Sequence, residues 1–91
     1  MALTKETIVD KIEVLERGQV QVRTATRVLE DGVALSSSFH RHVVEPSTKA
    51  SGSWADTDIS GEDARVQAVA NATWTDSVKT AYQEMIDAQE L

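Results

Sequence analysis

The fold is decided by residues 16–32, ERGQVQVRTATRVLEDG, a strand-like run enclosed by two turn signals. Within residues 19–29, β-branched residues are frequent and apolar types alternate with polar ones, which is typical of a strand with one buried face. Asp31 and Gly32 form a two-residue type I′ turn signal, because both positions need positive φ. The ERG sequence that ends at Gly18 suits a three-residue loop with glycine in the left-handed position. This stretch therefore predicts the middle strand of two successive hairpins.

Strand-like sequence continues on both sides of this run. We predict a three-stranded antiparallel β-meander with strands at residues 7–15, 19–29 and 33–44. Counting outward from the two turns sets the register, which places one set of apolar residues on one face. That predicted core face consists of Ile8, Ile12, Val14, Val20, Val22, Val28, Leu35, Phe39 and Val43.

The second half of the chain changes in character. Residues 46–59 are small and polar, and we predict a loop there that is flexible or ordered by a partner. A helix is predicted at 61–73, beginning at a capping-box-like sequence at Ser60. A second helix is predicted at 76–89 from apolar residues spaced by three and four, and Trp74 is expected to fill the core between the helices. The expected fold is one α+β domain with both helices packed on one face of the meander.

Composition limits the possible functions. The chain has 91 residues, no cysteine and a net charge of −6. A domain of this size buries about 60–65% of the surface that its unfolded chain exposes, so we expect modest stability and a partner that completes it. The negative charge disfavours binding to nucleic acid or to anionic membranes. The absence of a signal-peptide pattern and of a long apolar run predicts a soluble protein that stays where it is made.

His40 and His42 raise the question of a metal site. Both are predicted on the face opposite the core, about 6.5–7 Å apart along one strand, and two imidazoles at that distance can share a metal. However, Lys11, Arg23 and Arg27 are predicted on the same face, and the sequence offers no third ligand beside them. We therefore predict no metal site and interpret the two histidines as contact residues, with solvated histidines as the alternative.

A basic stripe is predicted on an acidic protein, made of Lys11, Arg23, Arg27 and His40, and His42 is predicted to bind a partner beside them. A basic stripe suits the acidic surface of a neighbouring protein. The alternative is a solvated sheet face whose charge is balanced by carboxylates such as Glu13. Nucleic acid is disfavoured again, because the stacking aromatic residues of sheet-based binders are missing from this face.

Two further side chains have open interpretations. Trp54, in the predicted loop, either folds back over an edge of the core or contacts another chain, since tryptophan is enriched at interface hot spots. Arg41 is assigned to the apolar face, where its stem packs at the sheet margin with the head in water. The alternative for Arg41 is an ion pair with a helix carboxylate, at Glu62, Asp63 or Glu84.

No catalytic motif is present in the sequence. It contains no GxSxG, no P-loop, no HExxH, no glycine-rich dinucleotide turn and no cysteine nucleophile. A chain this short also leaves little room for a substrate pocket. We therefore predict no enzymatic activity, no cofactor and no small-molecule substrate, and we interpret the protein as one that acts by protein–protein contact.

The segments QVR, EDG, FHRHV and SGEDARVQA, spread over nearly the whole chain, resemble small proteins of tailed bacteriophages and prophages. Genes for such proteins lie among those for tail and tail-fibre proteins, and no defined activity is attached to them. The resemblance implies a virion part, an adaptor or accessory at the tail fibre or baseplate, assembled in the host bacterial cytoplasm. Its implied partners are a larger tail protein, copies of itself, or both. The alternative is a non-virion phage accessory protein that binds and modulates a host protein.

Overall fold

Five strands and two helices form the fold in the computed structural model of the chain, which describes residues 2–89. The elements are β1 Leu3–Val14, β2 Val20–Glu30, β3 Val33–Val44, β4 Ser47–Ala50, β5 Ser53–Asp56, α1 Ala64–Thr73 and α2 Asp76–Gln89. The first three strands form one antiparallel sheet in the order β1-β2-β3, and β4 pairs with β5 in a separate sheet. The predicted α+β class and the three-stranded meander are confirmed.

Both turns of the meander have the predicted conformation. Asp31 and Gly32 have φ values of 51° and 85°, as a type I′ turn requires, and Gly18 has a φ of 89°. The Leu15 N–H donates to the Gln19 carbonyl oxygen at 2.8 Å and closes the three-residue loop. The local turn chemistry therefore fixes the order of the strands.

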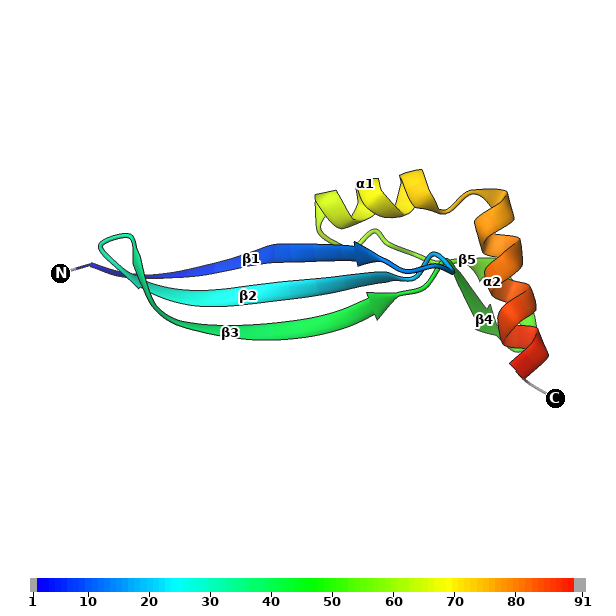
Figure 1. Cartoon of the computed structure of the whole chain (residues 1–91), viewed down its shortest axis with the longest axis horizontal. Helices are drawn as coiled ribbons and strands as arrows, with labels where there is room; N and C mark the ends of the chain where they lie inside the picture. Colours follow the sequence, from blue (N-terminus) through cyan, green and yellow to red (C-terminus); the bar gives the residue numbers. More distant parts are fainter. Residues whose placement is uncertain (1, 90–91) are drawn as a thin grey trace.

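The molecule is elongated, because the long sheet projects beyond the helices (Figure 1). Its radius of gyration is 17.0 Å and its longest extent is 58 Å. A compact domain of this length would have a radius of gyration of about 12 Å. The helices and the β4–β5 hairpin gather at one end, which we call the helical end. The outer part of the sheet, residues 3–8 and 25–39, is covered by no other described element, and we call it the arm.

The core lies at the helical end and is small. Its buried residues are Val20, Val22 and Val44 of the sheet together with Val66, Ala70 and Trp74. We call the side of the sheet that carries these valines the helix face and the other side the open face. Trp74 fills the junction between the helices, and its indole Nε1 donates to the Gly18 carbonyl oxygen at 2.7 Å.

Two β-bulges change the register away from the turns. The β1–β2 pairing shifts between Val9 and Lys11, which leaves Asp10 as an extra residue in β1. The β2–β3 pairing shifts between Val28 and Leu29, which leaves Leu35 as an extra residue in β3. When each strand is counted from its turn, the extra residue reverses the faces that the side chains beyond it occupy.

The predicted core face is therefore correct only for Ile12, Val20 and Val22. Val44, which pairs with Val20, takes the core position that was assigned to Val43. The residues wrongly assigned to the core are Ile8, Val14, Val28, Leu35, Phe39 and Val43, all of which are exposed. Bulges moved four of them to the wrong face, whereas Val14 and Val28 are on the helix face but remain exposed.

Residues 46–59 contain the β4–β5 hairpin where a loop was predicted, so that prediction was wrong. The hairpin turns at Ser51 and Gly52, which have φ values of 52° and 79°. Its strands have four residues each, too few to produce a clear alternation of apolar and polar residues.

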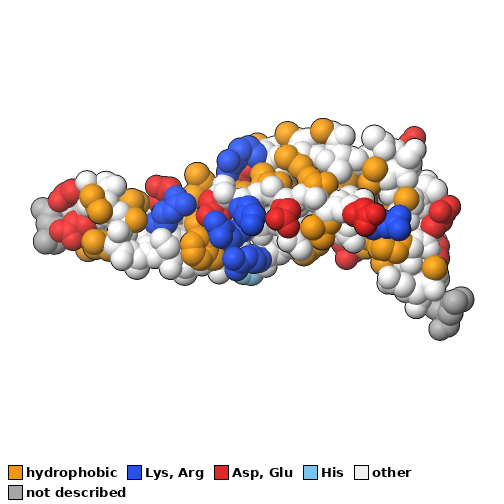
Figure 2. Space-filling model, viewed as in Figure 1, with side chains coloured by type: hydrophobic (Ala, Val, Ile, Leu, Met, Phe, Trp, Pro, Cys, Tyr) orange, Lys and Arg blue, Asp and Glu red, His pale blue; other side chains and the backbone are white. Residues whose placement is uncertain are grey.

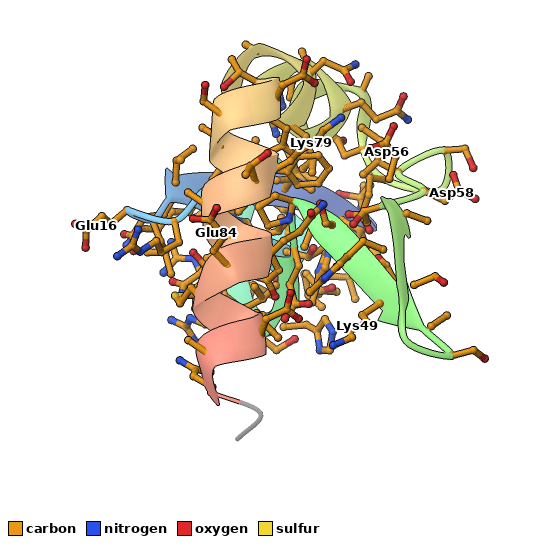
Figure 3. The ribbon with its side chains drawn as sticks, turned by 90° about the vertical axis from the view of Figure 1, so that its right-hand side faces the viewer. Glu16, Lys49, Asp56, Asp58, Lys79 and Glu84 are labelled. Carbon is orange, nitrogen blue, oxygen red and sulfur yellow. The ribbon has the colours of Figure 1, made fainter. Side chains whose placement is uncertain are left out.

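Helix α2 packs on this hairpin rather than on the long sheet. The Gln83 side chain donates to Ser47 Oγ at 3.1 Å. Lys79 Nζ lies 3.0 Å from the carboxylate of Asp56, and both side chains are labelled in Figure 3. The apolar stripe of α2 was correctly located in the sequence. The stripe was predicted to pack on the meander, whereas α2 packs on the β4–β5 hairpin, which was not predicted.

Helix α1 begins at Ala64, three residues later than predicted, whereas α2 covers the predicted range. The carboxylate of Asp63 accepts a hydrogen bond from the Arg65 backbone N–H at 2.9 Å and caps the helix. The predicted cap at Ser60 was wrong, because Asp63 occupies the N-cap position, whereas the Ser60 N–H donates to the carboxylate of Asp58.

We predict that Gly18→Ala destabilises the protein by about 2–5 kcal/mol, of which backbone strain contributes about 1–2 kcal/mol and overpacking about 1–3 kcal/mol. A Cβ atom at Gly18 would lie 2.5 Å from Cγ1 of Val78 and 3.1 Å from Cγ of Pro46, and φ is +89°. Urea denaturation measures the loss in free energy of unfolding.

The matched control is Gly52→Ala, where φ is +79° but nothing lies within 4 Å of the added Cβ. This variant has the backbone strain without the clash, and we expect its free energy of unfolding to fall by about 1–2 kcal/mol. Equal losses in the two variants would contradict the close packing of the β1–β2 turn against α2.

Candidate functional site

The open face of the sheet carries a group of cationic side chains, visible over the middle of the molecule in Figure 2. Lys11, Arg23 and Arg41 occupy paired positions on β1, β2 and β3, so they form one row across the sheet. Arg27 follows four residues after Arg23 on the same face. Three of the residues predicted to bind a partner, Lys11, Arg23 and Arg27, are thus brought together.

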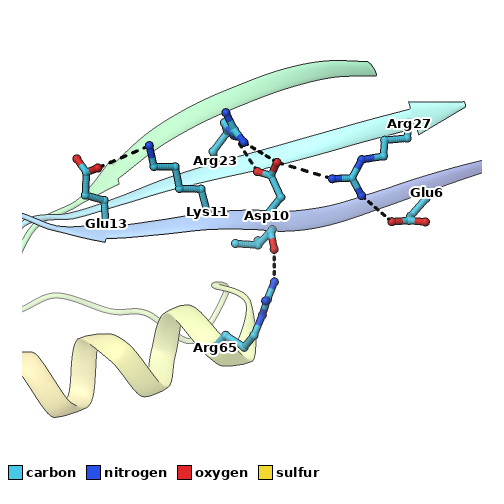
Figure 4. Close-up of polar contacts among 8 residues, drawn as sticks. Glu6, Asp10, Lys11, Glu13, Arg23, Arg27 and Arg65 are labelled. Carbon is cyan, nitrogen blue, oxygen red and sulfur yellow. Dashed lines mark hydrogen bonds and ion pairs between the residues drawn. The ribbon is translucent and has the colours of Figure 1, made fainter. Parts of the chain in front are cut away.

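Asp10 is the central anion of this group (Figure 4). Arg23 donates to both of its carboxylate oxygens, from Nε at 2.9 Å and from Nη2 at 2.8 Å. Arg27 lies 3.8 Å from the same carboxylate and donates to Glu6 at 3.0 Å. The bulge makes this arrangement possible, because it places Asp10 and Lys11 on the same face although they are adjacent in sequence.

These contacts shift the ionisation of the pair. The hydrogen bond from Arg23 lowers the pKa of the Asp10 carboxyl below its usual value of 3.8. The same bond raises the pKa of Arg23. Arg23 and Asp10 therefore remain charged together over the physiological range, and they stiffen the middle of the sheet.

Phe39 lies on the open face rather than in the core, and its side chain is exposed. Its ring centroid lies 4.5 Å from Cζ of Arg23, a cation–π contact. Ile8, Ala25 and Phe39 occupy one row across the three strands, next to the cationic row. The open face therefore presents apolar and cationic side chains side by side, the combination that protein interfaces favour.

A shallow hollow of about 190 Å³ lies within the open face. It is lined mainly by Lys11, Glu13, Gln21, Arg23, Arg41 and Val43. Arg41 was predicted on the apolar face, but the bulge at Leu35 turns it to the open face. Small-molecule pockets usually have volumes of about 300–1,000 Å³, so this hollow suits a side chain of a partner protein.

His40 and His42 lie on the helix face, opposite the three cations with which they were grouped. Because Leu35 is an extra residue, His42 pairs with Val22 and His40 pairs with Thr24. His42 Nε2 lies 2.8 Å from Glu62 Oε1, and the two imidazole rings stack with centroids 6.2 Å apart. The predicted basic stripe is thus wrong as one surface, since the sheet separates the two histidines from its cations.

The structure also bears on the metal site considered for these histidines. Within residues 2–89, no group of three or more His, Asp or Glu side chains is arranged to hold a metal ion. Glu62 lies beside His42. It does not lie beside Arg41, so Glu62 is not the helix carboxylate that the alternative interpretation of Arg41 required.

Trp54 folds back onto α2, the first of its two interpretations. Its ring packs edge-on against Tyr82 with centroids 6.1 Å apart. Its Nε1 donates to Asp87 at 3.4 Å, and Lys49 lies 5.5 Å from the ring centroid. The side chain is half-buried, so its outer edge is still available to another molecule.

The two edges of the sheet differ in chemistry. Strand β1 carries five charged residues, Lys5, Glu6, Asp10, Lys11 and Glu13. The guanidinium of Arg65 on α1 also donates to the Val9 carbonyl oxygen of this edge (Figure 4). Strand β3 has a single Lys, Arg, Asp or Glu residue, Arg41, and every residue from 31 to 41 is exposed. Strand β3 is therefore the less protected edge of the sheet.

No protein-family profile matches this chain, and no curated protein or solved structure matches it either. In residues 2–89 there is no helix with the length and apolar character needed to cross a membrane. The candidate site is therefore defined by its own geometry, as an uncovered sheet with a cationic and aromatic open face.

We predict that Asp10→Asn makes stability less sensitive to acid. The folded-state pKa of Asp10 is depressed, so its contribution is present above the unfolded value of 3.8 and is lost as the pH falls through the folded pKa. Melting temperatures measured from neutral pH to below pH 3.8 should show a gap between wild type and variant that closes in acid. A gap that stays constant with pH would contradict the Asp10–Arg23 pairing.

We predict that Tyr82 loses its phenolic proton at an unusually high pH. Burial, aided by a hydrogen bond to the Glu45 carboxylate, raises the pKa of Tyr82 from 10.0 to about 12. The unfolded state therefore loses this proton first, and stability should fall as the pH rises from 10 to 12. Phenolate absorbance reports this residue directly, since the sequence has one tyrosine.

The control for this titration is Glu45→Gln, which removes the anionic acceptor and leaves the burial. It should lower the midpoint for Tyr82 without returning it to the ordinary value, because burial is the larger cause. A wild-type midpoint at 10.0 would contradict the packing of α2 against the rest of the helical end.

Proposed function

We propose that this protein is a structural or assembly part of a phage tail, an adaptor or accessory at the tail fibre or baseplate that acts by protein–protein contact. The observation that carries the proposal is the arm, a sheet with neither face covered by another described element. A partner is the simplest means of covering such a surface.

The energetics of the arm favour a bound state. Its exposed large apolar residues are Leu3, Ile8, Val28, Val33, Leu35 and Phe39. Full burial of one such side chain contributes about 1.5–3 kcal/mol. A three-stranded sheet that is stable in water usually packs one face against another element, and the arm has no such cover within residues 2–89. Association with a larger protein would supply that cover and would stabilise the folded chain.

The open face indicates the chemistry of this larger partner. Arg41 is exposed, borders the hollow, and forms no ion pair with a described residue. Lys11, Arg23 and Arg27 surround it with partly compensated charge. An acidic side chain of a tail protein would fit between them, which agrees with the expected role of Lys11, Arg23 and Arg27 in partner binding. The resemblance of the sequence to small tail-associated phage proteins supports the tail as the location.

A second candidate function is a non-virion phage factor that binds and modulates a host protein. The distribution of charge favours it. Residues 1–44 contain six Lys or Arg and six Asp or Glu, whereas residues 45–91 contain three and nine. The whole net charge of −6 therefore belongs to the second part of the chain, whose described residues, 45–89, lie at the helical end. Such an acidic surface could recognise a basic host protein.

Mass spectrometry of purified virions distinguishes the two functions. We expect the chain to be present in particles and to remain through a salt wash, since apolar contacts are not screened. Its absence from purified particles would contradict the tail assignment and favour the host-directed alternative.

The open face has its own test. Arg41→Glu should reduce incorporation into virions about tenfold, because it places a carboxylate where an acidic partner group is expected. Arg17→Glu is the matched control, with the same substitution at an exposed position in the β1–β2 turn, outside both the arm and the hollow of the open face. Equal incorporation of the two variants would exclude the open face as the contact surface.

A further inference from the structure

Strand β3 is an edge without the usual protection against pairing. Natural edge strands are commonly protected by charged side chains, proline or an overlying element. From Val33 to Val44, β3 contains no proline and no carboxylate, and its one permanent charge is Arg41. Four of the exposed large apolar residues of the chain are on this strand, Val33, Leu35, Phe39 and Val43.

The opposite edge shows the protection that β3 lacks. Strand β1 has charges along its length, and Arg65 occupies the carbonyl oxygen of Val9. One sheet thus has one edge that rejects a further strand and one edge that can accept it. This asymmetry indicates that an additional strand joins at β3.

We propose that β3 pairs antiparallel with β3 of a second copy of this chain, with the two-fold axis within Ser36-Ser37-Ser38. The inference rests on the proposed function, because it names the partner that pairs with one edge of the arm in the assembled tail. The product is a continuous six-stranded sheet that has a helical end at each extremity.

The sequence of β3 has the symmetry that such a dimer needs. A two-fold interface brings the same surface of both copies together, so the strand must be complementary to itself. Leu35 and Phe39 lie two residues on either side of Ser37, and each would therefore meet the other across the axis. The three serines at the centre are small and neutral, and they permit close approach of the two backbones.

The bulge in β3 is compatible with this pairing. It lies at Leu35, at one side of the serine triplet, and residues from Ser36 to Val44 pair with β2 without a further shift. A bulge beside the axis limits how far the strands pair in a regular way. The sheet ends as a dimer because the outer edges of the six-stranded sheet are the two charged β1 strands.

The distribution of charge selects a second copy in the antiparallel direction. The described residues of the second part of the chain, 45–89, lie at the helical end and contain three Lys or Arg and eight Asp or Glu, whereas residues 1–44 have no net charge. Antiparallel pairing of β3 places the two acidic helical ends at opposite extremities. A strand of twelve residues spans about 40 Å, several times the screening length of about 8 Å at physiological salt. Parallel pairing would bring the two acidic ends together.

The absence of cysteine from the chain allows a direct test. Single variants Ser36→Cys, Ser37→Cys and Ser38→Cys are oxidised in purified protein and analysed for covalent dimers. Only a residue at the axis faces its own copy, and opposed residues in antiparallel strands are close enough for a disulfide. We expect one of the three variants to form a covalent dimer efficiently. Thr7→Cys, an exposed position on β1, is the control and should stay monomeric.

A charge at the axis provides the second measurement. Ser37→Glu places two carboxylates opposite each other, and we expect it to weaken dimerisation at least tenfold in sedimentation equilibrium. Thr7→Glu adds the same charge to β1 and should leave the dimer unchanged. A wild-type chain that stays monomeric at every concentration, or a dimer that crosslinks through Thr7→Cys, would overturn the inference.

The outcomes also separate this inference from the proposed function. If the wild-type chain is monomeric but Ser37→Glu prevents incorporation into virions, a strand of another tail protein occupies β3. The second copy is then excluded while the tail assignment stands. If the dimer crosslinks at the serine triplet but the chain is absent from virions, the interface is supported and its role in the tail is lost.

Discussion

The hydrogen bond from the Trp74 indole to the Gly18 carbonyl joins the two parts of this molecule. Gly18 belongs to the turn between β1 and β2, and Trp74 lies between the two helices. The bond is buried, and the space above Gly18 is filled by Val78 and Pro46, so only glycine fits there. Together with the packing of Val66 and Ala70 in the same core as Val20 and Val22, this contact joins the long sheet to the helices.

The small size of that core explains the surface chemistry. Ten residues of α1 cover only the part of the sheet around Val20 and Val22, and α2 packs on the β4–β5 hairpin. The rest of the sheet must be stabilised in another way. On the open face, Arg23 and Arg27 bind Asp10 and Glu6 across the strands, which holds β1 to β2 without a hydrophobic cover. These polar contacts leave the apolar row at Phe39 open to a partner.

The turns were predictable because they depend on local chemistry, whereas the faces of the strands were not. One signal of the first bulge exists in the sequence: Ile8-Val9 and then Asp10-Lys11 are adjacent residues of like character, which interrupts the alternation. Such doubled residues indicate an extra residue in a strand. The bulge at Leu35 has no comparable signal, since alanine and serines surround it. The histidines were therefore placed on the wrong face and Phe39 was wrongly placed in the core.

The sequence by itself determined the α+β class, the meander, its two turns and the range of α2, since each follows from short-range backbone preferences and from periodicity. The tertiary structure decided which face each side chain of β3 occupies, what α2 covers, and which sheet edge remains open. These features depend on pairing and packing between distant residues. One inserted residue reverses the faces of the side chains beyond it, and the pairing with the neighbouring strand decides where that residue is inserted.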